Sequence, residues 1–256
     1  MNAFARTLRL RRLHRHGTGL LVVPLDHALT TGPVAPDRHR DDLVDEITAN
    51  GADAIILHKG GVRHLRPEWF VRSSLIVHLS AGTVRSPDPD ARCLVADVAE
   101  ALRCGADAVS VHVNLGSVEE QRQLRDLAVV AGACDRWNLP LLAMVYPRGP
   151  SITDQSDPEL VAHAVSVAVE LGADIVKTVY PGSSALAAIT RTCPIPVLVA
   201  GGPRLDSTSD VMDLVTAAMR SGAAGVAIGR NIFATAAPGA MTKKIAEIVH
   251  GQEERA

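Results

Sequence analysis

Short apolar runs, separated by segments of helical length, recur along the whole chain and constrain its fold more than any other feature. Eight of these runs are rich in valine, isoleucine, leucine and alanine, and they span residues 20–25, 54–58, 75–79, 108–113, 141–145, 175–179, 197–200 and 225–228. Buried strands that alternate with helices are typical of βα units in a parallel sheet. Eight units are the number that closes a (β/α)8 TIM barrel, so we predict an α/β protein with this fold.

A repeated pair of small residues supports this count, because it precedes four of the predicted strands. The pairs begin with glycine and lie at residues 51–52, 105–106, 172–173 and 222–223. Glycine suits the left-handed backbone conformation that ends many helices, after which the chain can turn directly into a strand. Apolar residues at spacings of three and four predict helices at residues 41–49, 95–103, 119–133, 159–171 and 209–220.

The length of the chain fits one domain. It has 256 residues, and a barrel of this type typically takes about 250. No linker divides the chain, so we predict a single domain over residues 1–256. Residues 1–19 form a basic segment that lacks the apolar core of a targeting peptide. We expect this segment to cover the bottom of the barrel or to contact another subunit.

The composition argues against several classes of partner. The formal charge of −2 gives no long-range attraction for nucleic acid or anionic lipid. Aromatic residues make up only 3% of the chain, too few for a base-stacking platform. The four cysteines lack metal-ligand spacing, and no secretory signal is recognised. We therefore expect a cytoplasmic protein with reduced thiols and with no nucleic-acid or membrane partner.

Polar residues at the carboxyl ends of the predicted strands are the candidate site, because the functional face of such a barrel lies there. These residues are Asp26, His27, His58, Lys59, His78, Ser80, His112, Asn114, Tyr146, Arg148, Lys177, Gly201, Gly202, Gly229 and Arg230.

Lys177 is the strongest candidate for chemistry. Only four of the 26 basic residues are lysines, and Lys177 lies within a predicted strand. Strand alternation puts it on one face with Ile175 and Val179, either in the barrel mouth or under a helix. Burial disfavours an ammonium ion, and a neutral amine can attack a carbonyl to form a Schiff base. The alternatives are a structural ion pair, a simple phosphate contact, or Lys59 as the reactive amine, although Gly60-Gly61 favours a solvated loop for Lys59.

Two further residues could handle protons. Tyr146 ends the predicted strand next to that of Lys177, and a phenol there can pass a proton to a substrate oxygen. Asp26 ends the first strand, where a carboxylate can assist imine formation. The alternatives are a core tyrosine with its hydroxyl at the rim and an aspartate that caps a loop.

Glycines after the last two strands point to an oxyanion. Gly201-Gly202 and Gly229 follow strands seven and eight, where backbone N–H groups of such barrels often bind phosphate. Plain turns are the alternative. The histidines at residues 58, 78 and 112 could together bind a divalent metal, but no carboxylate accompanies them. We therefore expect neither a metal nor a cofactor.

Taken in order, the motifs at the strand ends resemble the class I aldolases of the DeoC/FbaB type. Within that family they are most similar to the synthases of 2-amino-3,7-dideoxy-D-threo-hept-6-ulosonate and their secondary-metabolism relatives. The resemblance covers residues 20–250, and its motifs include Pro24-Leu25-Asp26-His27, Leu57-His58-Lys59-Gly60, Ala143-Met144-Val145-Tyr146-Pro147-Arg148-Gly149, Asp174-Ile175-Val176-Lys177-Thr178, Ala200-Gly201-Gly202-Pro203 and Gly225-Val226-Ala227-Ile228-Gly229-Arg230.

The resemblance implies roles for individual residues. Lys177 would form the Schiff base, Tyr146 would donate a proton, and Asp26 would accept one. The residues implied in substrate binding are His27, Ala28, Leu29, Thr30, Pro147, Arg148, Gly201, Gly202, Pro203, Gly229 and Arg230.

The resemblance also implies substrates. A phosphorylated keto-sugar, either dihydroxyacetone phosphate or a deoxy-ketohexose phosphate, would be joined to L-aspartate 4-semialdehyde. The product would be an amino-keto heptanoate or heptulosonate, a precursor of an aromatic compound of the aminobenzoate type. A homo-oligomer is expected from the habit of the family.

Two positions depart from the family pattern and bear on which donor or acceptor fits. Ala28 and Val179 stand where relatives have glycine and asparagine. A class I fructose-bisphosphate aldolase is the alternative function. A metal-dependent aldolase and a non-catalytic phosphosugar-binding protein are further alternatives.

Overall fold

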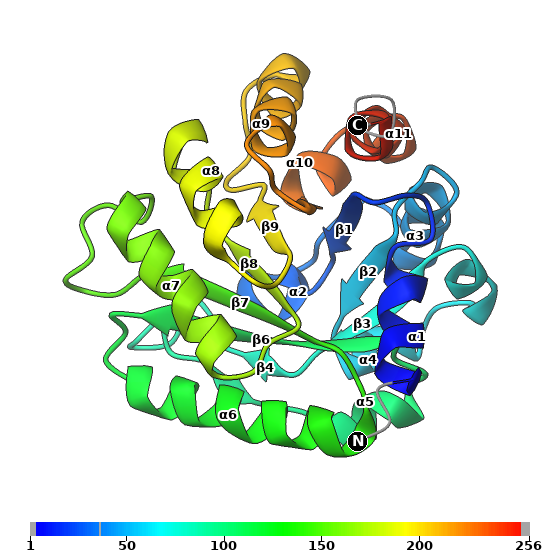
Figure 1. Cartoon of the computed structure of the whole chain (residues 1–256). Helices are drawn as coiled ribbons and strands as arrows, with labels where there is room; N and C mark the ends of the chain where they lie inside the picture. The colour runs from blue at the N-terminus through cyan, green and yellow to red at the C-terminus, as the bar shows by residue number, and fades with distance from the viewer. Residues whose placement is uncertain (1–3, 36, 252–256) are drawn as a thin grey trace.

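Eight parallel strands close into a barrel with helices around its outside (Figure 1). The computed structural model describes residues 4–35 and 37–251. Around the barrel the strands follow the order β1-β10-β9-β8-β7-β6-β3-β2. Their bounds are Leu20–Pro24 (β1), Ala54–Leu57 (β2), Ser74–His78 (β3), Ala108–Leu115 (β6), Leu141–Pro147 (β7), Ile175–Thr178 (β8), Val197–Ala200 (β9) and Gly225–Ala227 (β10). The predicted TIM barrel is confirmed.

The helices form an outer ring around the strands (Figure 1). The longer ones are Arg40–Thr48 (α3), Glu120–Trp137 (α6), Pro158–Glu170 (α7), Ser183–Thr192 (α8), Thr208–Arg220 (α9) and Pro238–His250 (α11), with Val98–Arg103 (α5) shorter. Local signals start several of them: Asp97 and Glu100 form a capping box on α5, and Ser207 and Asp210 form one on α9. The four glycines of the predicted repeat have φ between +83° and +93°, as the left-handed position requires.

Several small elements between the strands and the longer helices were not predicted from the sequence. Short helices follow three strands: His27–Thr31 (α2), Lys59–Val62 (α4) and Arg230–Phe233 (α10). A 3-10 helix at Pro67–Val71 (η1) precedes β3, and a small hairpin of Ser80–Ala81 (β4) and Cys93–Leu94 (β5) follows it. Single turns of this length carry too little periodicity to be recognised.

The core has two layers, as strand alternation in a barrel requires. Residues such as Val22, Ile56, Met144 and Ile175 fill the barrel itself. Their neighbours along the strands, such as Val176, pack outward against the helices. This alternation fixes the direction of each side chain at the strand ends, and it is what aims Lys177 inward.

The basic segment begins with helix α1 (Phe4–Leu13), which lies against the amino ends of several strands. Arg6 pairs with Asp174 just before β8 at 3.0 Å, and the Ser74 hydroxyl at the start of β3 donates to the Arg12 carbonyl at 3.0 Å. Leu13 is fully buried in the inner layer. Residues 1–3 of this segment lie outside the described residues.

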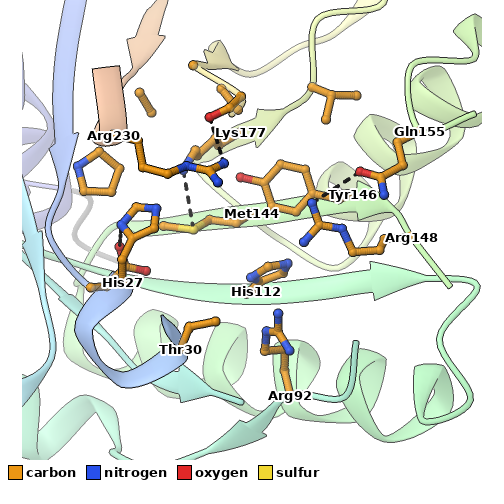
Figure 2. Close-up of a pocket in the computed structure, with 18 of the residues that line it drawn as sticks. His27, Thr30, Arg92, His112, Met144, Tyr146, Arg148, Gln155, Lys177 and Arg230 are labelled. Carbon is orange, nitrogen blue, oxygen red and sulfur yellow. Dashed lines mark hydrogen bonds and ion pairs between the residues drawn. The ribbon is translucent and has the colours of Figure 1, made fainter. Parts of the chain in front are cut away.

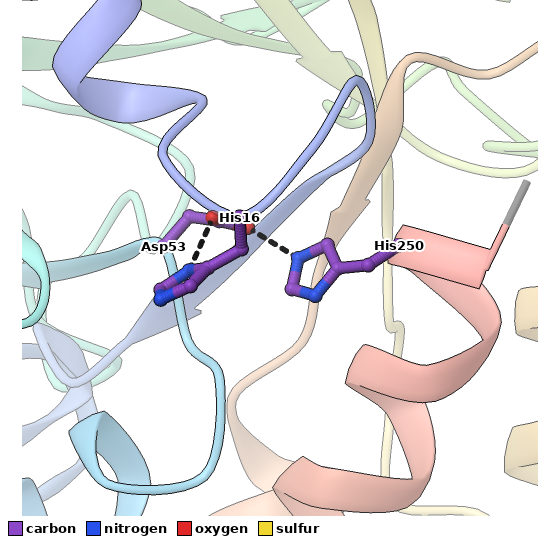
Figure 3. Close-up of side chains that lie close together, drawn as sticks. All are labelled: His16, Asp53 and His250. Atoms are coloured by element: carbon purple, nitrogen blue, oxygen red, sulfur yellow. Dashed lines mark hydrogen bonds and ion pairs between the residues drawn. The ribbon is translucent and has the colours of Figure 1, made fainter. Parts of the chain in front are cut away.

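A buried aspartate joins the segment before β1 to the last turn of α11 (Figure 3). Asp53 bonds His16 Nδ1 and His250 Nε2, each at 2.8 Å, and accepts a hydrogen bond from the Leu21 amide at 2.7 Å. In the described part of the chain these three side chains are the group close enough to share a metal ion. Both Asp53 carboxylate oxygens are hydrogen-bonded within the protein, so these three residues form a structural contact between the segment before β1 and helix α11.

Candidate active site

A cavity of about 500 Å³ lies at the carboxyl ends of the strands, where the sequence predicted the site (Figure 2). Eleven of the predicted residues line it: Asp26, His27, Thr30, His112, Tyr146, Arg148, Lys177, Gly201, Gly202, Gly229 and Arg230. They lie at or near the ends of six neighbouring strands in the barrel order β1-β10-β9-β8-β7-β6.

Lys177 reaches this cavity from β8. Its side chain belongs to the inner layer because β8 alternates, and the residue is only 8% exposed. Its amine lies 4.0 Å from the Met144 sulfur, on the paired strand β7, and donates a weak hydrogen bond to it. No carboxylate among the described residues lies within ion-pairing distance of this amine, so the side chain does not serve as half of a structural ion pair.

Lys59 is placed quite differently. Its amine pairs with Glu100 at 2.7 Å, and it does not line the cavity. The sequence predicted a solvated loop, but Lys59 instead begins the short helix α4, with its side chain 36% exposed. One turn forms there because Gly61 and Val62 bond back to the His58 carbonyl.

Tyr146 lies one strand away from Lys177 and faces the same cavity. Met144 pairs with Lys177 across β7 and β8, and Tyr146 is the next residue of β7 on that inward face. Its ring packs edge-on against His112, with centroids 4.9 Å apart, and the Arg148 guanidinium lies 5.7 Å from its centre. These contacts fix the ring, and its hydroxyl points among the cavity residues (Figure 2).

Asp26 lies beneath the cavity among basic side chains. Its Oδ1 lies 3.6 Å from His27 Nδ1, and its Oδ2 lies 3.8 Å from His78 Nε2. Burial opposes its ionisation, but His78, His27 and Lys177 outweigh burial and lower the pKa of Asp26 to about 2. The group is therefore a carboxylate at neutral pH. Its Oδ1 is buried without a hydrogen-bond partner among the described residues, so it is free to accept a proton or a hydrogen bond.

The three rim histidines make separate hydrogen bonds and do not gather around one point. His78 bonds the Ser110 hydroxyl at 2.8 Å, His58 bonds the His78 carbonyl at 3.2 Å, and His112 bonds Asn114 at 2.8 Å. Burial lowers the pKa of His78 to about 4 and lowers that of the other two as well. They are neutral imidazoles that build the wall of the site.

The turns after β9 and β10 form one joined structure. Gly202 has φ +66°, and no atom lies within 4 Å of where a Cβ would stand. A Cβ on Gly229 would approach the Pro24 carbonyl to 2.5 Å, so only glycine fits there. Arg230 donates to the Gly202 carbonyl at 2.8 Å, which places its guanidinium beside both turns.

Asn231 holds these turns together, a role that its sequence position did not reveal. Its amide donates to the Gly201 and Pro203 carbonyls at 2.9 and 3.0 Å, and its Oδ1 accepts from the Leu205 amide at 2.8 Å. The side chain is buried, so these bonds are shielded from water.

Four residues implied in substrate binding do not line the cavity. Ala28 and Leu29 lie on other sides of the α2 turn, from which His27 and Thr30 face the cavity, and Leu29 is exposed. Pro147 follows Tyr146 on β7, so strand alternation turns it outward. Pro203 lies beyond Gly202, and its carbonyl is bonded to Asn231.

The sequence also missed residues that do line the cavity. Among them are Asp90, Arg92, Met144, Gln155 and Val179. Asp90 and Arg92 lie in the segment between β4 and β5, which no strand end marks, so strand-end reasoning could not find them. Val179 does lie on the predicted inward face of β8 and could have been included.

A barrel whose mouth holds a buried amine, a phenol and a carboxylate beside glycine turns has the make-up of an enzyme that processes carbonyl compounds through a Schiff base. The chain belongs to the DeoC/LacD family of aldolases, whose family model matches residues 20–235. Across the described residues, no helix is both long enough and apolar enough to cross a bilayer.

Two named relatives cover nearly the whole chain. A 2-amino-4,5-dihydroxy-6-oxo-7-(phosphonooxy)heptanoate synthase of Streptomyces griseus is 58% identical over 254 residues, which is 98% of this chain and 93% of that protein. A 2-amino-3,7-dideoxy-D-threo-hept-6-ulosonate synthase of Halobacterium salinarum is 40% identical over 259 residues, with the same coverage of 98% and 93%. Both relatives are named as synthases.

Solved structures of aldolases share the fold of this chain. An archaeal fructose 1,6-bisphosphate aldolase matches with a TM-score of 0.88 at 27% identity, covering 96% of this chain and 99% of that one. Another, described with its catalytic lysine covalently bound to the carbinolamine intermediate of its substrate, matches with a TM-score of 0.86 at 26% identity, covering 96% and 100%.

Proposed function

We propose that this chain is a class I aldolase that joins a phosphorylated keto-sugar to L-aspartate 4-semialdehyde. The donor is dihydroxyacetone phosphate or a deoxy-ketohexose phosphate, and the product is an amino-keto heptanoate or heptulosonate that leads to an aromatic compound of the aminobenzoate type. The synthases that are 58% and 40% identical support this choice of reaction.

The observation that carries the proposal is the setting of Lys177. Its side chain is almost fully buried and lines the cavity, and among the described residues its amine donates a hydrogen bond only to the Met144 thioether. No described carboxylate pairs with this amine, so its nitrogen is available to attack a carbonyl carbon placed in the cavity.

The donor half of the reaction uses the joined turns and the lysine. Backbone groups of Gly202 and Gly229, with Arg230, bind the phosphate. The amine of Lys177 adds to the ketone, whose oxygen takes a proton from water. Asp26 accepts a proton from the attacking nitrogen and returns it to the new hydroxyl, which leaves as water and gives an iminium. Loss of a proton from the adjacent carbon gives an enamine; a deoxy-ketohexose phosphate donor reaches an enamine by retro-aldol cleavage instead.

The acceptor half uses the phenol. The enamine carbon attacks the aldehyde carbon of the acceptor, and the new alkoxide takes the proton of the Tyr146 hydroxyl. Water then adds to the iminium and releases the product, which restores the free amine. The phenolate regains a proton when the next donor iminium loses one.

We also propose a cytoplasmic location and a homo-oligomeric state. The four free cysteines fit a reducing compartment. The substrates are small molecules, and no nucleic-acid or membrane partner is needed.

The experiment that tests the proposal compares two lysine variants. Lys177→Arg keeps the positive charge but cannot form an imine, so we expect turnover to fall by at least about 10³-fold. Lys59→Arg is the matched control, because Lys59 pairs with Glu100 outside the cavity, and we expect near-normal turnover. Substantial turnover by Lys177→Arg, or an equal loss in both variants, would contradict the proposal.

A fructose-bisphosphate aldolase is the second candidate, because solved aldolases of that specificity share the fold. Their identity of 27% is well below that of the two synthases. A competition assay separates the two functions. With dihydroxyacetone phosphate as donor, we expect aspartate semialdehyde to be consumed in preference to glyceraldehyde 3-phosphate.

A further inference from the structure

A buried arginine at the far side of the cavity forms no ion pair with any described residue. Arg92 is only 6% exposed and lines the cavity, and it donates hydrogen bonds to the carbonyls of Pro89 and Ala91, both at 2.7 Å. No acidic side chain in the described ranges lies within ion-pairing distance of it. A guanidinium taken out of water without a counter-ion is unfavourable, so an anion is the expected occupant of the space beside it.

A second arginine adds to the positive charge at this place. Arg148 leaves β7 beside Tyr146, bonds Gln155 at 3.3 Å, and has a buried Nε with no partner in the described chain. Burial, and then the repulsion of Arg148, lower the pKa of Arg92. Figure 2 shows Arg92 pointing toward His112, and Arg148 beside the Tyr146 ring.

The position of this charge relative to Lys177 is fixed by the barrel. Lys177 is on β8; the phosphate turns follow β9 and β10 on one side, and Arg148 follows β7 on the other. The segment that carries Arg92 is bound to β6, because Asn114 donates to the Asp90 carbonyl at 2.7 Å. An anion at Arg92 therefore lies across the Schiff-base lysine from the donor phosphate, on the side of Tyr146.

Asp90 lies two residues before Arg92 and lines the same cavity. Its backbone carbonyl accepts from Asn114 and Gln123, but its carboxylate makes no hydrogen bond or ion pair within the described residues. Arg92 and Asp90 thus offer one cavity a guanidinium and a carboxylate that are not paired with each other. They match the two charges of an α-amino acid, since the arginine fork fits a carboxylate and the aspartate fits an ammonium.

We propose that Arg92, with Arg148 beside it, binds the α-carboxylate of the aldehyde acceptor, and that Asp90 binds its α-amino group. This subsite rests on the proposed function, and it gives that function its acceptor specificity. Gly82 makes room for it, because a Cβ there would lie 2.7 Å from Arg92 Nη1 and 2.3 Å from the Ala91 carbonyl.

Three acceptors that differ by one charged group test the subsite. L-Aspartate 4-semialdehyde carries both groups, succinate semialdehyde lacks the amine, and 3-aminopropanal lacks the carboxylate. In Arg92→Met we expect kcat/KM to fall about 100-fold for the two acceptors that carry a carboxylate, aspartate semialdehyde and succinate semialdehyde. For 3-aminopropanal we expect kcat/KM to stay within about twofold of the wild-type value. In Asp90→Asn we expect kcat/KM to fall about tenfold for the two acceptors that carry an amine, aspartate semialdehyde and 3-aminopropanal, and to stay unchanged for succinate semialdehyde.

Arg85→Met is the matched control, because Arg85 is exposed on the same loop, and this variant should use all three acceptors with normal kcat/KM.

Two results would overturn the inference. An equal fall in kcat/KM for every acceptor in Arg92→Met would show that Arg92 has a structural role, and no fall for any acceptor would show that it does not bind the acceptor. Trapping of dihydroxyacetone phosphate on Lys177 by borohydride checks the integrity of each variant. If the wild-type protein itself traps no donor, the proposed function fails, whereas normal trapping with unselective loss removes the subsite alone.

Discussion

At the scale of single residues, the geometry divides the work between two side chains on neighbouring strands. The amine of Lys177 and the ring of Tyr146 face one cavity, but they would act at different steps, the first in imine formation and the second in protonation of the alkoxide. Variants of the two residues should therefore fail at different points of the reaction.

Tyr146→Phe tests this division. Removal of the phenol proton donor should lower aldol turnover by about 10²- to 10⁴-fold, while borohydride should still trap the donor on Lys177. Tyr180 is the other tyrosine of the chain, and its hydroxyl bonds Ser183 at 2.6 Å, so Tyr180→Phe is the matched control. Loss of donor trapping in Tyr146→Phe, or full turnover, would contradict the assignment.

At the scale of elements, the donor site depends on how the turns after β9 and β10 are joined. Three hydrogen bonds of the buried Asn231 side chain connect these turns and the chain that follows. The backbone groups that would contact a phosphate are positioned by this side chain, which is not exposed to the substrate.

Asn231→Ala should therefore weaken donor binding more than it slows chemistry. We expect the KM for dihydroxyacetone phosphate to rise at least about tenfold, and the free energy of unfolding to fall by about 1–3 kcal/mol. Asn50→Ala is the control, because Asn50 bonds the Glu46 carbonyl just before β2, at the opposite end of the barrel. It should lose stability without a change in KM. Equal KM values for Asn231→Ala and the wild-type protein would argue against a joined phosphate site.

The elements also show what could be predicted from the sequence. All eight strands were predicted to within two residues at each end, because each buried strand leaves a short apolar run at a regular place between helical segments. Lys177, Tyr146 and Asp26 were predicted as site residues because each stands at or near such a strand end, and the structure places all three at one cavity. Arg92 and Asn231 were not, because one lies on an irregular loop and the other acts through backbone carbonyls that only the folded chain brings near.

At the scale of the whole molecule, a group of neutral histidines links the site to stability. Burial lowers the pKa of His78 to about 4 from an ordinary value of 6.5, so between these values the unfolded chain binds a proton that the folded chain does not. The free energy of unfolding is therefore at its full value above pH 6.5. It decreases as the pH falls from 6.5 toward 4, by about 3 kcal/mol for this one residue. His27, His58 and His112 shift in the same direction.

Urea unfolding at pH 7.5 and pH 5 measures this dependence. The wild-type protein should be less stable at pH 5, and His78→Gln, which can keep a hydrogen bond to Ser110, should lose less stability between the two conditions. His14→Gln is the control, since His14 is not buried and bonds the Thr18 carbonyl. An unchanged difference in His78→Gln would mean that His78 is not the group responsible.

The central claim is that one amine in the mouth of the barrel forms a covalent bond with the donor. It is tested most directly by treating the wild-type protein with dihydroxyacetone phosphate and borohydride, then mapping the modified peptide by mass spectrometry. The account predicts a reduced donor adduct on Lys177 and on no other lysine. An adduct on Lys59, or none at all, would contradict it.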